Sequence, residues 1–256
     1  MFTVEIPLVK GNAENIRHKE TDTLENTISA PDAKILVTDD NEFNLKVASG
    51  LLGFMDIDAE MADSGAKAIE LVKRNEYDIV FMDHMMPEMD GVETVHEIRK
   101  LGGKFEEITI VALTANAVSG AREMFLENGF NDFISKPIDA GQLQEIVKRY
   151  LPLDKVHAVD ASESKQTVTD KEDQLRKKSI ITFVKENTDT FKEITGLLSA
   201  GDIKTVHRIA HTLKSSSGFL GKTELQEAAF SLEKSLYGEN AEYTPEQLST
   251  LERELA

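Results

Sequence analysis

The chain has 256 residues, of which 40% are hydrophobic, and this length can supply two modest domains with a core each. It contains no cysteine, which excludes disulfides, thiolate nucleophiles and thiolate metal sites. Lys and Arg number 29 against 46 Asp and Glu, and the net charge of −17 disfavours nucleic acid as a partner. No segment approaches the roughly 18 apolar residues of a spanning helix, so we expect a cytoplasmic protein without membrane contact of its own.

The first 33 residues contain one short strand pattern and a polar stretch. Residues 1–10 include the alternating run FTVEIPLV, which is typical of a single strand. Residues 11–33 are polar and are expected to form a linker. A lone strand does not fold by itself, so this one needs a partner elsewhere.

Residues 34–152 show apolar runs that alternate with segments of helical period. The runs are KILVTD, DIDAEM, YDIVFMD, ITIVALT and DFISKP. Strands that alternate with helices indicate a parallel sheet with helices on both faces. We therefore predict an α/β domain with a doubly wound, five-stranded parallel sheet.

Three acidic residues stand at the carboxyl ends of these predicted strands. Asp39 and Asp40 end the first run, and Asp83 ends the third. In an open parallel sheet the carboxyl ends of strands gather at one edge, where the strand order reverses. Three adjacent carboxylates repel one another unless a cation neutralises them, and Mg²⁺ has the required preference for oxygen ligands.

Two further strand ends carry groups that bind phosphate. Thr114 ends the fourth run with a hydroxyl, and Lys136 ends the fifth with an ammonium. A carboxylate nucleophile, a divalent cation, a hydroxyl and an ammonium are what phosphoryl transfer to an aspartate requires. Each residue alone is more simply a helix cap or a solvated side chain, but the ordered set favours a phosphoryl-transfer site.

Residues 34–152 resemble a response-regulator receiver domain, through the acidic pair, MDHMMPEMDG, the threonine in ALTANA and the SKP lysine. The resemblance implies that Asp83 is phosphorylated and that Thr114 and Lys136 bind the phosphoryl oxygens. It also implies a Mg²⁺ site made by Asp40, Asp83 and the backbone carbonyl of Met85, with Asp39 acting mainly through water.

The remaining chain reads as a linker followed by helices. Residues 153–170 are polar, charged and poor in aromatics, which is the composition of a linker. Residues 171–256 show only helical periods with short interruptions. They predict an all-α domain built as a four-helix bundle.

One predicted helix, in GDIKTVHRIAHTLKSSSGFLG, carries a polar stripe beside its apolar stripe. His211 lies in that stripe, with Lys214 three residues later and small residues after it. Imidazole is a competent phosphoryl acceptor near neutral pH, and Lys214 would attract the phosphate. A surface or capping histidine is the simpler alternative, and His207 with His211 could bind a metal, although no third ligand motif is nearby.

HTLKSSSGFLG resembles the phosphoacceptor motif of histidine phosphotransfer domains, which implies that His211 carries phosphate. The family usually has glycine where this chain has Ser215, whose hydroxymethyl group could narrow the docking surface. FTVEIPL resembles the last strand of the ATP-binding domain of sensor histidine kinases. These resemblances together imply the C-terminal part of a hybrid sensor histidine kinase, without the motifs that bind ATP, so the chain is not expected to phosphorylate itself from ATP.

The sequence therefore predicts a two-component phosphorelay protein. Asp83 would accept a phosphoryl group from the phosphohistidine of an upstream kinase and exchange it with His211, which would pass it to a downstream response regulator. One alternative is a Mg²⁺-dependent phosphatase with an aspartyl nucleophile, although haloacid-dehalogenase-type enzymes have a second acid where this chain has Met85. Another alternative is a module that docks partners without phosphate chemistry.

Overall fold

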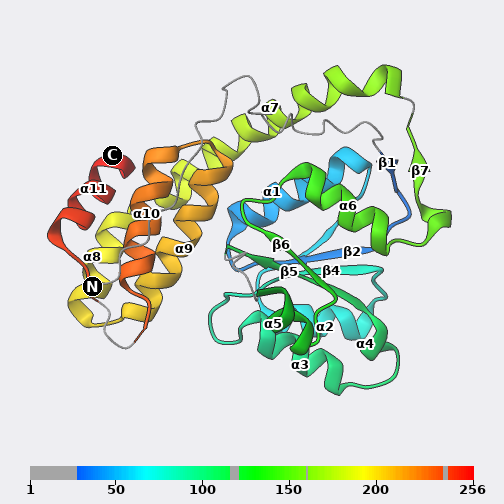
Figure 1. The fold of residues 1–256 in the computed structure, drawn as a ribbon, viewed down its shortest axis with the longest axis horizontal. Coiled ribbons are helices and arrows are strands. Elements are labelled where there is room, and N and C mark those ends of the chain that lie inside the picture. Colours follow the sequence, from blue (N-terminus) through cyan, green and yellow to red (C-terminus); the bar gives the residue numbers. More distant parts are fainter. Residues whose placement is uncertain (1–27, 116–120, 160, 239–241) are drawn as a thin grey trace, which may run out of the picture.

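The computed structural model describes residues 28–115, 121–159, 161–238 and 242–256. It contains an α/β domain followed by a helical domain, as the sequence predicts (Figure 1). The strand predicted within residues 1–10 lies outside the described residues. Among the helices that the structure describes, none is long and apolar enough to cross a membrane.

The α/β domain contains a five-stranded parallel sheet with the order β3-β2-β4-β5-β6. Its strands are β2 (Ile35–Thr38), β3 (Glu60–Ala62), β4 (Ile79–Asp83), β5 (Thr109–Thr114) and β6 (Asp132–Ser135). The strand order reverses between β2 and β4, and every residue of these two strands is buried. The carboxyl ends of β2 and β4 are therefore neighbours at the edge where open parallel sheets bind ligands.

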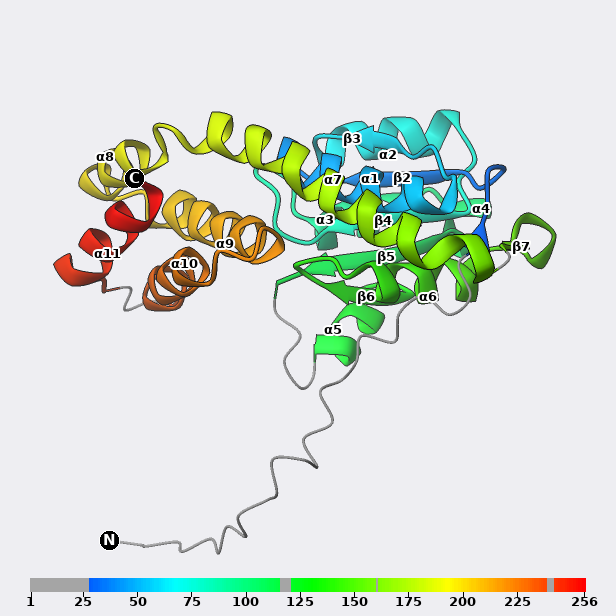
Figure 2. The same cartoon turned by 90° about the horizontal axis from the view of Figure 1, so that it is seen from above.

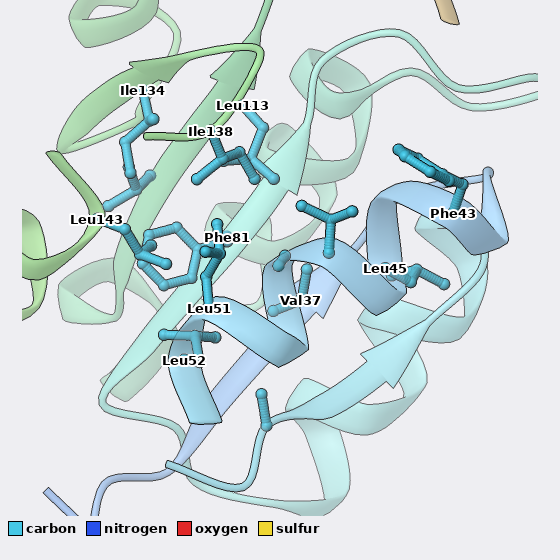
Figure 3. Close-up of a cluster of buried hydrophobic side chains, with 14 of the residues drawn as sticks. Val37, Phe43, Leu45, Leu51, Leu52, Phe81, Leu113, Ile134, Ile138 and Leu143 are labelled. Carbon is cyan, nitrogen blue, oxygen red and sulfur yellow. The ribbon is translucent and has the colours of Figure 1, made fainter. Parts of the chain in front are cut away.

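Helices cover both faces of the sheet. α1 (Glu42–Leu52) and α6 (Ala140–Tyr150) lie on one face, and the other face carries α2 (Gly65–Arg74), α3 (Gly91–Lys100), the short α4 (Lys104–Glu107) and α5 (Ala121–Glu127). Val37 and Phe81 pack toward α1 and α6 in the core shown in Figure 3. Leu36 and Val80 pack toward α2 and α3. Successive strand residues thus point to opposite faces of the sheet. Because helices cover both faces, every residue of β2 and β4 is buried, which explains the continuous apolar runs.

The loop after β4 packs tightly against the end of that strand. A Cβ at Gly91 would lie 2.2 Å from the carbonyl oxygen of Asp83, so a glycine is required there. Asp90 caps α3 together with Glu93 in a reciprocal capping box. Glycine and cap together let α3 begin directly beside Asp83.

The connection between the domains is more ordered than its composition suggests. β1 (Ile28–Ser29) pairs antiparallel with β7 (His157–Ala158), which follows a 3₁₀ turn at Leu153–Lys155. α7 (Ala161–Asn187) is 27 residues long and begins within the stretch expected to be a linker. It packs along α1, and Figure 2 shows it continuing from the α/β domain to the helical domain.

The helical domain is a bundle in which the end of α7 joins four shorter helices. These are α8 (Thr190–Ala200), α9 (Ile203–Phe219), α10 (Thr223–Ser235) and α11 (Pro245–Leu255). α9 packs against α8 and α10, and α11 packs against α10. Val206, Ala210 and Leu213 of α9 are buried at the helical spacing that the sequence indicates.

Candidate functional site

The carboxylates of Asp39, Asp40 and Asp83 converge at the carboxyl ends of β2 and β4. Each offers an oxygen within 4.8 Å of the other two, and this is the one potential metal-binding group of three or more His, Asp or Glu side chains among the described residues. Asp39 Oδ1 accepts hydrogen bonds from the Asn41 backbone N–H and Asn44 Nδ2, both at 3.0 Å. The start of α1 therefore holds Asp39 in place.

Lys136 is the cation of this carboxylate cluster. Its Nζ donates to Asp39 Oδ2 at 2.6 Å and lies 2.9 Å from Asp83 Oδ1, with all three side chains buried. Burial raises the pKa of Asp83, and the charges of Asp39 and Asp40 act in the same direction while Lys136 opposes them. Burial opposes the charge of Lys136, but the carboxylates of Asp39 and Asp83 outweigh it and raise the pKa of Lys136. The ammonium is thus fixed in its charged form.

The end of β5 supports the same arrangement. Thr114 is buried, and its carbonyl oxygen accepts a hydrogen bond from the backbone N–H of Lys136 at 2.6 Å. The Lys136-Pro137 peptide bond is cis. The threonine and the lysine therefore lie side by side at the strand ends that carry the acids.

The carboxylate cluster suits a hard divalent cation. Its donors are carboxylate oxygens, which Mg²⁺ prefers, and burial raises the pKa of Asp40 as well as that of Asp83. A cation bound there would relieve the repulsion among the three acids. Met85 lies two residues beyond the carboxyl end of β4, in the loop that leads to α3.

His211 lies buried on α9 in a hydrogen-bonded unit with two other side chains. Its Nδ1 is 2.6 Å from Glu233 Oε1 of α10, and Lys214 Nζ donates to Glu233 Oε2 at 2.5 Å. Burial raises the pKa of Glu233, but the hydrogen bonds and charges of His211 and Lys214 outweigh it, so the pKa is lowered and the carboxylate is an acceptor only. Nδ1 of His211 must therefore carry the proton.

The other ring nitrogen of His211, Nε2, carries no proton and keeps its lone pair. Nε2 is buried and has no hydrogen-bond partner among the residues that the structure describes. Burial lowers the pKa of the His211 imidazole, and Glu233 offsets only part of this effect. The ring is consequently neutral at pH 7, with an unprotonated Nε2 on the side away from Glu233.

The carboxylate cluster and His211 lie on opposite sides of one interface. His84 directly follows Asp83, and its ring centroid is 5.8 Å from that of His211. Burial, with the neighbouring His211, lowers the pKa of His84 to about 3, so the two rings meet without charge repulsion. Arg208, one turn before His211 on α9, forms an ion pair with Asp40.

A cleft of about 290 Å³ opens between the two domains. Lys136 of the α/β domain and Lys214 of the helical domain both line it, together with Ala115, Gln226, Glu227 and Phe230. The cleft thus places one cation from each domain around the same space. That arrangement suits an anion shared by both domains.

Comparison with protein-family models assigns both domains. Residues 35–148 match the model of the response regulator receiver domain, and residues 179–256 match that of the Hpt domain. The chain therefore carries a receiver domain followed by an Hpt domain. Together the two domains indicate two-component phosphorelay signalling.

Curated relatives with similar sequences are histidine kinases. Signal transduction histidine-protein kinase BarA of Escherichia coli K12 is 36% identical over 118 residues, which is 46% of this chain. Histidine kinase 3 of Arabidopsis thaliana is 36% identical over 137 residues, and hybrid signal transduction histidine kinase K of Dictyostelium discoideum is 30% identical over 153. The chain covers only 13% of the length of each of these relatives.

Solved structures similar to part of the chain include receiver domains. The receiver domain of a sensor histidine kinase from Pseudomonas aeruginosa, described with a coordinated magnesium ion, is 34% identical, with a TM-score of 0.43. It matches 46% of this chain over 96% of its own length. Chemotaxis protein CheY4 of Vibrio cholerae is 24% identical, with a TM-score of 0.44, and matches 46% of this chain over 98% of its length.

The structure brings together the residues that the sequence singles out. The receiver residues meet at one edge of the sheet, and Lys214 and His211 share Glu233 on the Hpt side. Ser215 is buried, and its Oγ donates to the carbonyl oxygen of His211 at 3.2 Å. His207 is only partly buried and lies 6.0 Å from the Tyr237 ring, outside any candidate metal cluster of the described residues.

Sequence reasoning missed Glu233, His84 and Arg208. Glu233 had a weak signal, because it falls four residues after the buried Ala229 and so points a charge at the apolar side of α10. The contacts of His84 and Arg208 cross between the receiver and Hpt domains. No local pattern reports such contacts, which depend on how the two domains dock.

Proposed function

We propose that Asp83 of the receiver domain and His211 of the Hpt domain exchange a phosphoryl group directly within this chain. The observation that carries the proposal is the contact between His84 and His211, which sets the acceptor histidine against the residue that follows Asp83. Lys136 and Lys214 line the cleft between the two domains. Phosphoryl transfer depends mostly on positioning and charge neutralisation, and the histidine contact and the two lysines support the proposal on these two counts.

The first step loads Asp83 from an upstream sensor histidine kinase. A carboxylate oxygen of Asp83 attacks the phosphorus of the donor phosphohistidine, the P–N bond breaks, and an acyl phosphate forms. Lys136 gives up part of its contact with the Asp39 and Asp83 carboxylates and pairs with the phosphoryl oxygens. The Thr114 hydroxyl donates a hydrogen bond to the same phosphoryl oxygens. Asp40, Asp83 and the backbone carbonyl of Met85 would hold Mg²⁺, which would supply further positive charge.

The second step passes the phosphoryl group to His211. The lone pair of Nε2 attacks the phosphorus, the bond from phosphorus to the Asp83 oxygen breaks, and Asp83 leaves as a carboxylate. Nδ1 keeps its proton, and Glu233 stabilises the positive charge that the ring gains. The product is a phosphohistidine, which a downstream response regulator takes up on its own aspartate by the same chemistry in reverse. We place the relay and both partners in the cytoplasm.

The test is phosphorylation of the purified chain with a small acyl-phosphate donor and Mg²⁺. Wild type, Asp83→Asn and His211→Gln are compared by intact mass and by the acid and base stability of the phosphate. We expect base-stable, acid-labile phosphate in wild type, none in Asp83→Asn, and only base-labile phosphate in His211→Gln. His207→Gln, one turn earlier on α9, is the matched control and should behave as wild type.

If neither residue is labelled even with a kinase donor, the exchange is wrong. The phosphate-independent docking module would then be the better account. Labelling of His211 in the Asp83→Asn variant would also contradict the order of the two steps.

A further inference from the structure

An aromatic side chain of the receiver domain packs against two aromatic side chains of the Hpt domain, Phe183 and Phe219, which we call the pocket. Phe43 is the second residue of α1, and its exposed fraction is 1%. Its ring centroid lies 5.9 Å from that of Phe183 on α7 and 6.0 Å from that of Phe219 on α9. The interplanar angles of 73° and 78° are those of edge-to-face packing, the favoured geometry of aromatic pairs.

Polar contacts surround this aromatic cluster of Phe43, Phe183 and Phe219. Asn41 Nδ2 donates to Glu186 Oε2 at 3.3 Å, and Arg208 pairs with Asp40. An apolar centre with a polar rim is the usual composition of a specific protein–protein contact, and the buried aromatic is usually its anchor. Phe43 therefore has the position of an anchor between the two domains.

The pocket and His211 share helix α9 at the contact between the two domains. Phe219 follows His211 by eight residues on α9, so the two residues are about two helical turns, or about 12 Å along the helix axis, apart. On the receiver side, Phe43 follows the acidic pair of Asp39 and Asp40 by only three to four residues. The spacing between the carboxylate cluster and the anchor is thus fixed by the start of α1.

We infer that the pocket formed by Phe183 and Phe219 selects which receiver domains exchange phosphate with His211, by accepting a large aromatic side chain at the second residue of α1. The receiver of this chain is its occupant here. A separate receiver served by His211 carries an aromatic side chain at the same place. The inference rests on the proposed exchange between Asp83 and His211. It adds that an aromatic side chain at the second residue of α1 distinguishes the receivers that can take part in this exchange.

The test uses the full chain with Phe43 replaced by Tyr, Leu, Ala or Asp. Transfer from Asp83 to His211 is followed by rapid quenching and by the acid and base stability of the phosphate. We expect the rate to fall in the order Phe, Tyr, Leu, Ala, Asp, with a loss of roughly tenfold for Phe43→Ala. Labelling of Asp83 by the small donor needs no Hpt contact, so it checks that each receiver is folded.

Substitutions in the pocket provide the other half of the test. Phe183→Ala should slow transfer as much as Phe43→Ala, and the double variant should be no slower than either, because both remove the same contact. Ile181→Ala is the matched control, since Ile181 is 73% exposed two residues away on α7. Equal transfer rates across the Phe43 series would contradict the inference that the pocket selects receivers. Additive effects of Phe43→Ala and Phe183→Ala on the transfer rate would contradict it as well.

Small-angle X-ray scattering separates this inference from the proposed exchange. Without any phosphate, Phe43→Asp should increase the radius of gyration, because the two domains lose their anchor, and Ile181→Ala should not. If wild type never labels His211 but Phe43→Asp expands the molecule, the exchange fails and the pocket remains a docking site. If Phe43→Asp leaves the scattering unchanged, the pocket does not hold the domains together and the inference fails.

Discussion

Glu233 Oε1 lies 2.6 Å from Nδ1 of His211, and the same carboxylate accepts a hydrogen bond from Lys214. The contact fixes the tautomer of the imidazole, because an ionised carboxylate can only accept. It also directs Nε2 away from α10. An acidic residue on a neighbouring helix thus decides which nitrogen of His211 keeps its lone pair.

Glu233→Gln should slow the labelling of His211 by roughly tenfold, which corresponds to about 1.4 kcal/mol and is the size of a charge-assisted hydrogen bond. The pH dependence gives a second readout. Burial already lowers the pKa of His211. In wild type, Nε2 therefore becomes protonated, and can no longer accept a phosphoryl group, only below pH 6.5. Glu233 raises that pKa, so its loss should move the acid limb of the rate to still lower pH. Glu224→Gln, on the exposed first turn of α10, should change neither the rate nor the profile.

Lys136→Ala should abolish detectable labelling of Asp83 and destabilise the receiver domain. Removal of the ammonium leaves the buried carboxylates of Asp39 and Asp83 without their cation, which costs about 3 to 5 kcal/mol for a buried pair. Urea denaturation followed by circular dichroism measures the loss, and Mg²⁺ should restore part of it. Lys67→Ala breaks only the exposed pair with Asp63, and a change larger than about 1 kcal/mol there would contradict this account.

Ser215→Leu should block internal transfer while Asp83 still labels. Ser215 is buried and lines the interface beside Phe43 and Lys136, so a larger side chain cannot be accommodated without separating the domains. Ser215→Gly should transfer at least as fast as wild type, with a stability loss of about 1 kcal/mol from glycine within a helix. Quench-flow and thermal denaturation measure the two effects. Slower transfer in Ser215→Gly would show that the serine hydroxyl takes part in the exchange.

Chelation of divalent cations with EDTA should stop labelling of Asp83 by the acyl-phosphate donor, and added Mg²⁺ should restore it. Arg208→Ala should lower the Mg²⁺ concentration needed for half-maximal labelling, because Arg208 pairs with Asp40 in the carboxylate cluster. The Mg²⁺ titration of the labelling rate measures both effects. Arg253→Ala, which removes an exposed side chain of α11, is the control for the loss of one positive charge. An unchanged Mg²⁺ requirement in Arg208→Ala would mean that the arginine does not compete for Asp40.

The receiver side of the site could be predicted from the sequence because strand order and strand ends follow simple rules. Asp39, Asp83 and Lys136 each end an apolar run, and the rules of open parallel sheets then place them together. The Hpt side could be predicted only in part. His211 and Lys214 stand out by spacing, whereas Glu233 joins them through the packing of α10 on α9.

The relation between the domains could not be predicted, for a physical reason. The Arg208–Asp40 ion pair joins residues 168 positions apart in the sequence. It depends on the packing of α7 against α1, which brings the helical domain next to the α/β domain. The polar composition of residues 153–170 suggested a linker, but α7 begins at Ala161 within it. A solvated helix has the same polar composition as a linker, so tertiary contacts decide between the two.

In the proposed relay, the burial of His211 against its own receiver would make the internal receiver and a free regulator compete for the same imidazole. Because both domains belong to one chain and α7 packs along α1, the internal receiver would hold the advantage in that competition. A free regulator would gain access only during the intervals when the domains part. The frequency of those openings would then limit the flux of signal out of the chain, however fast the chemical steps are.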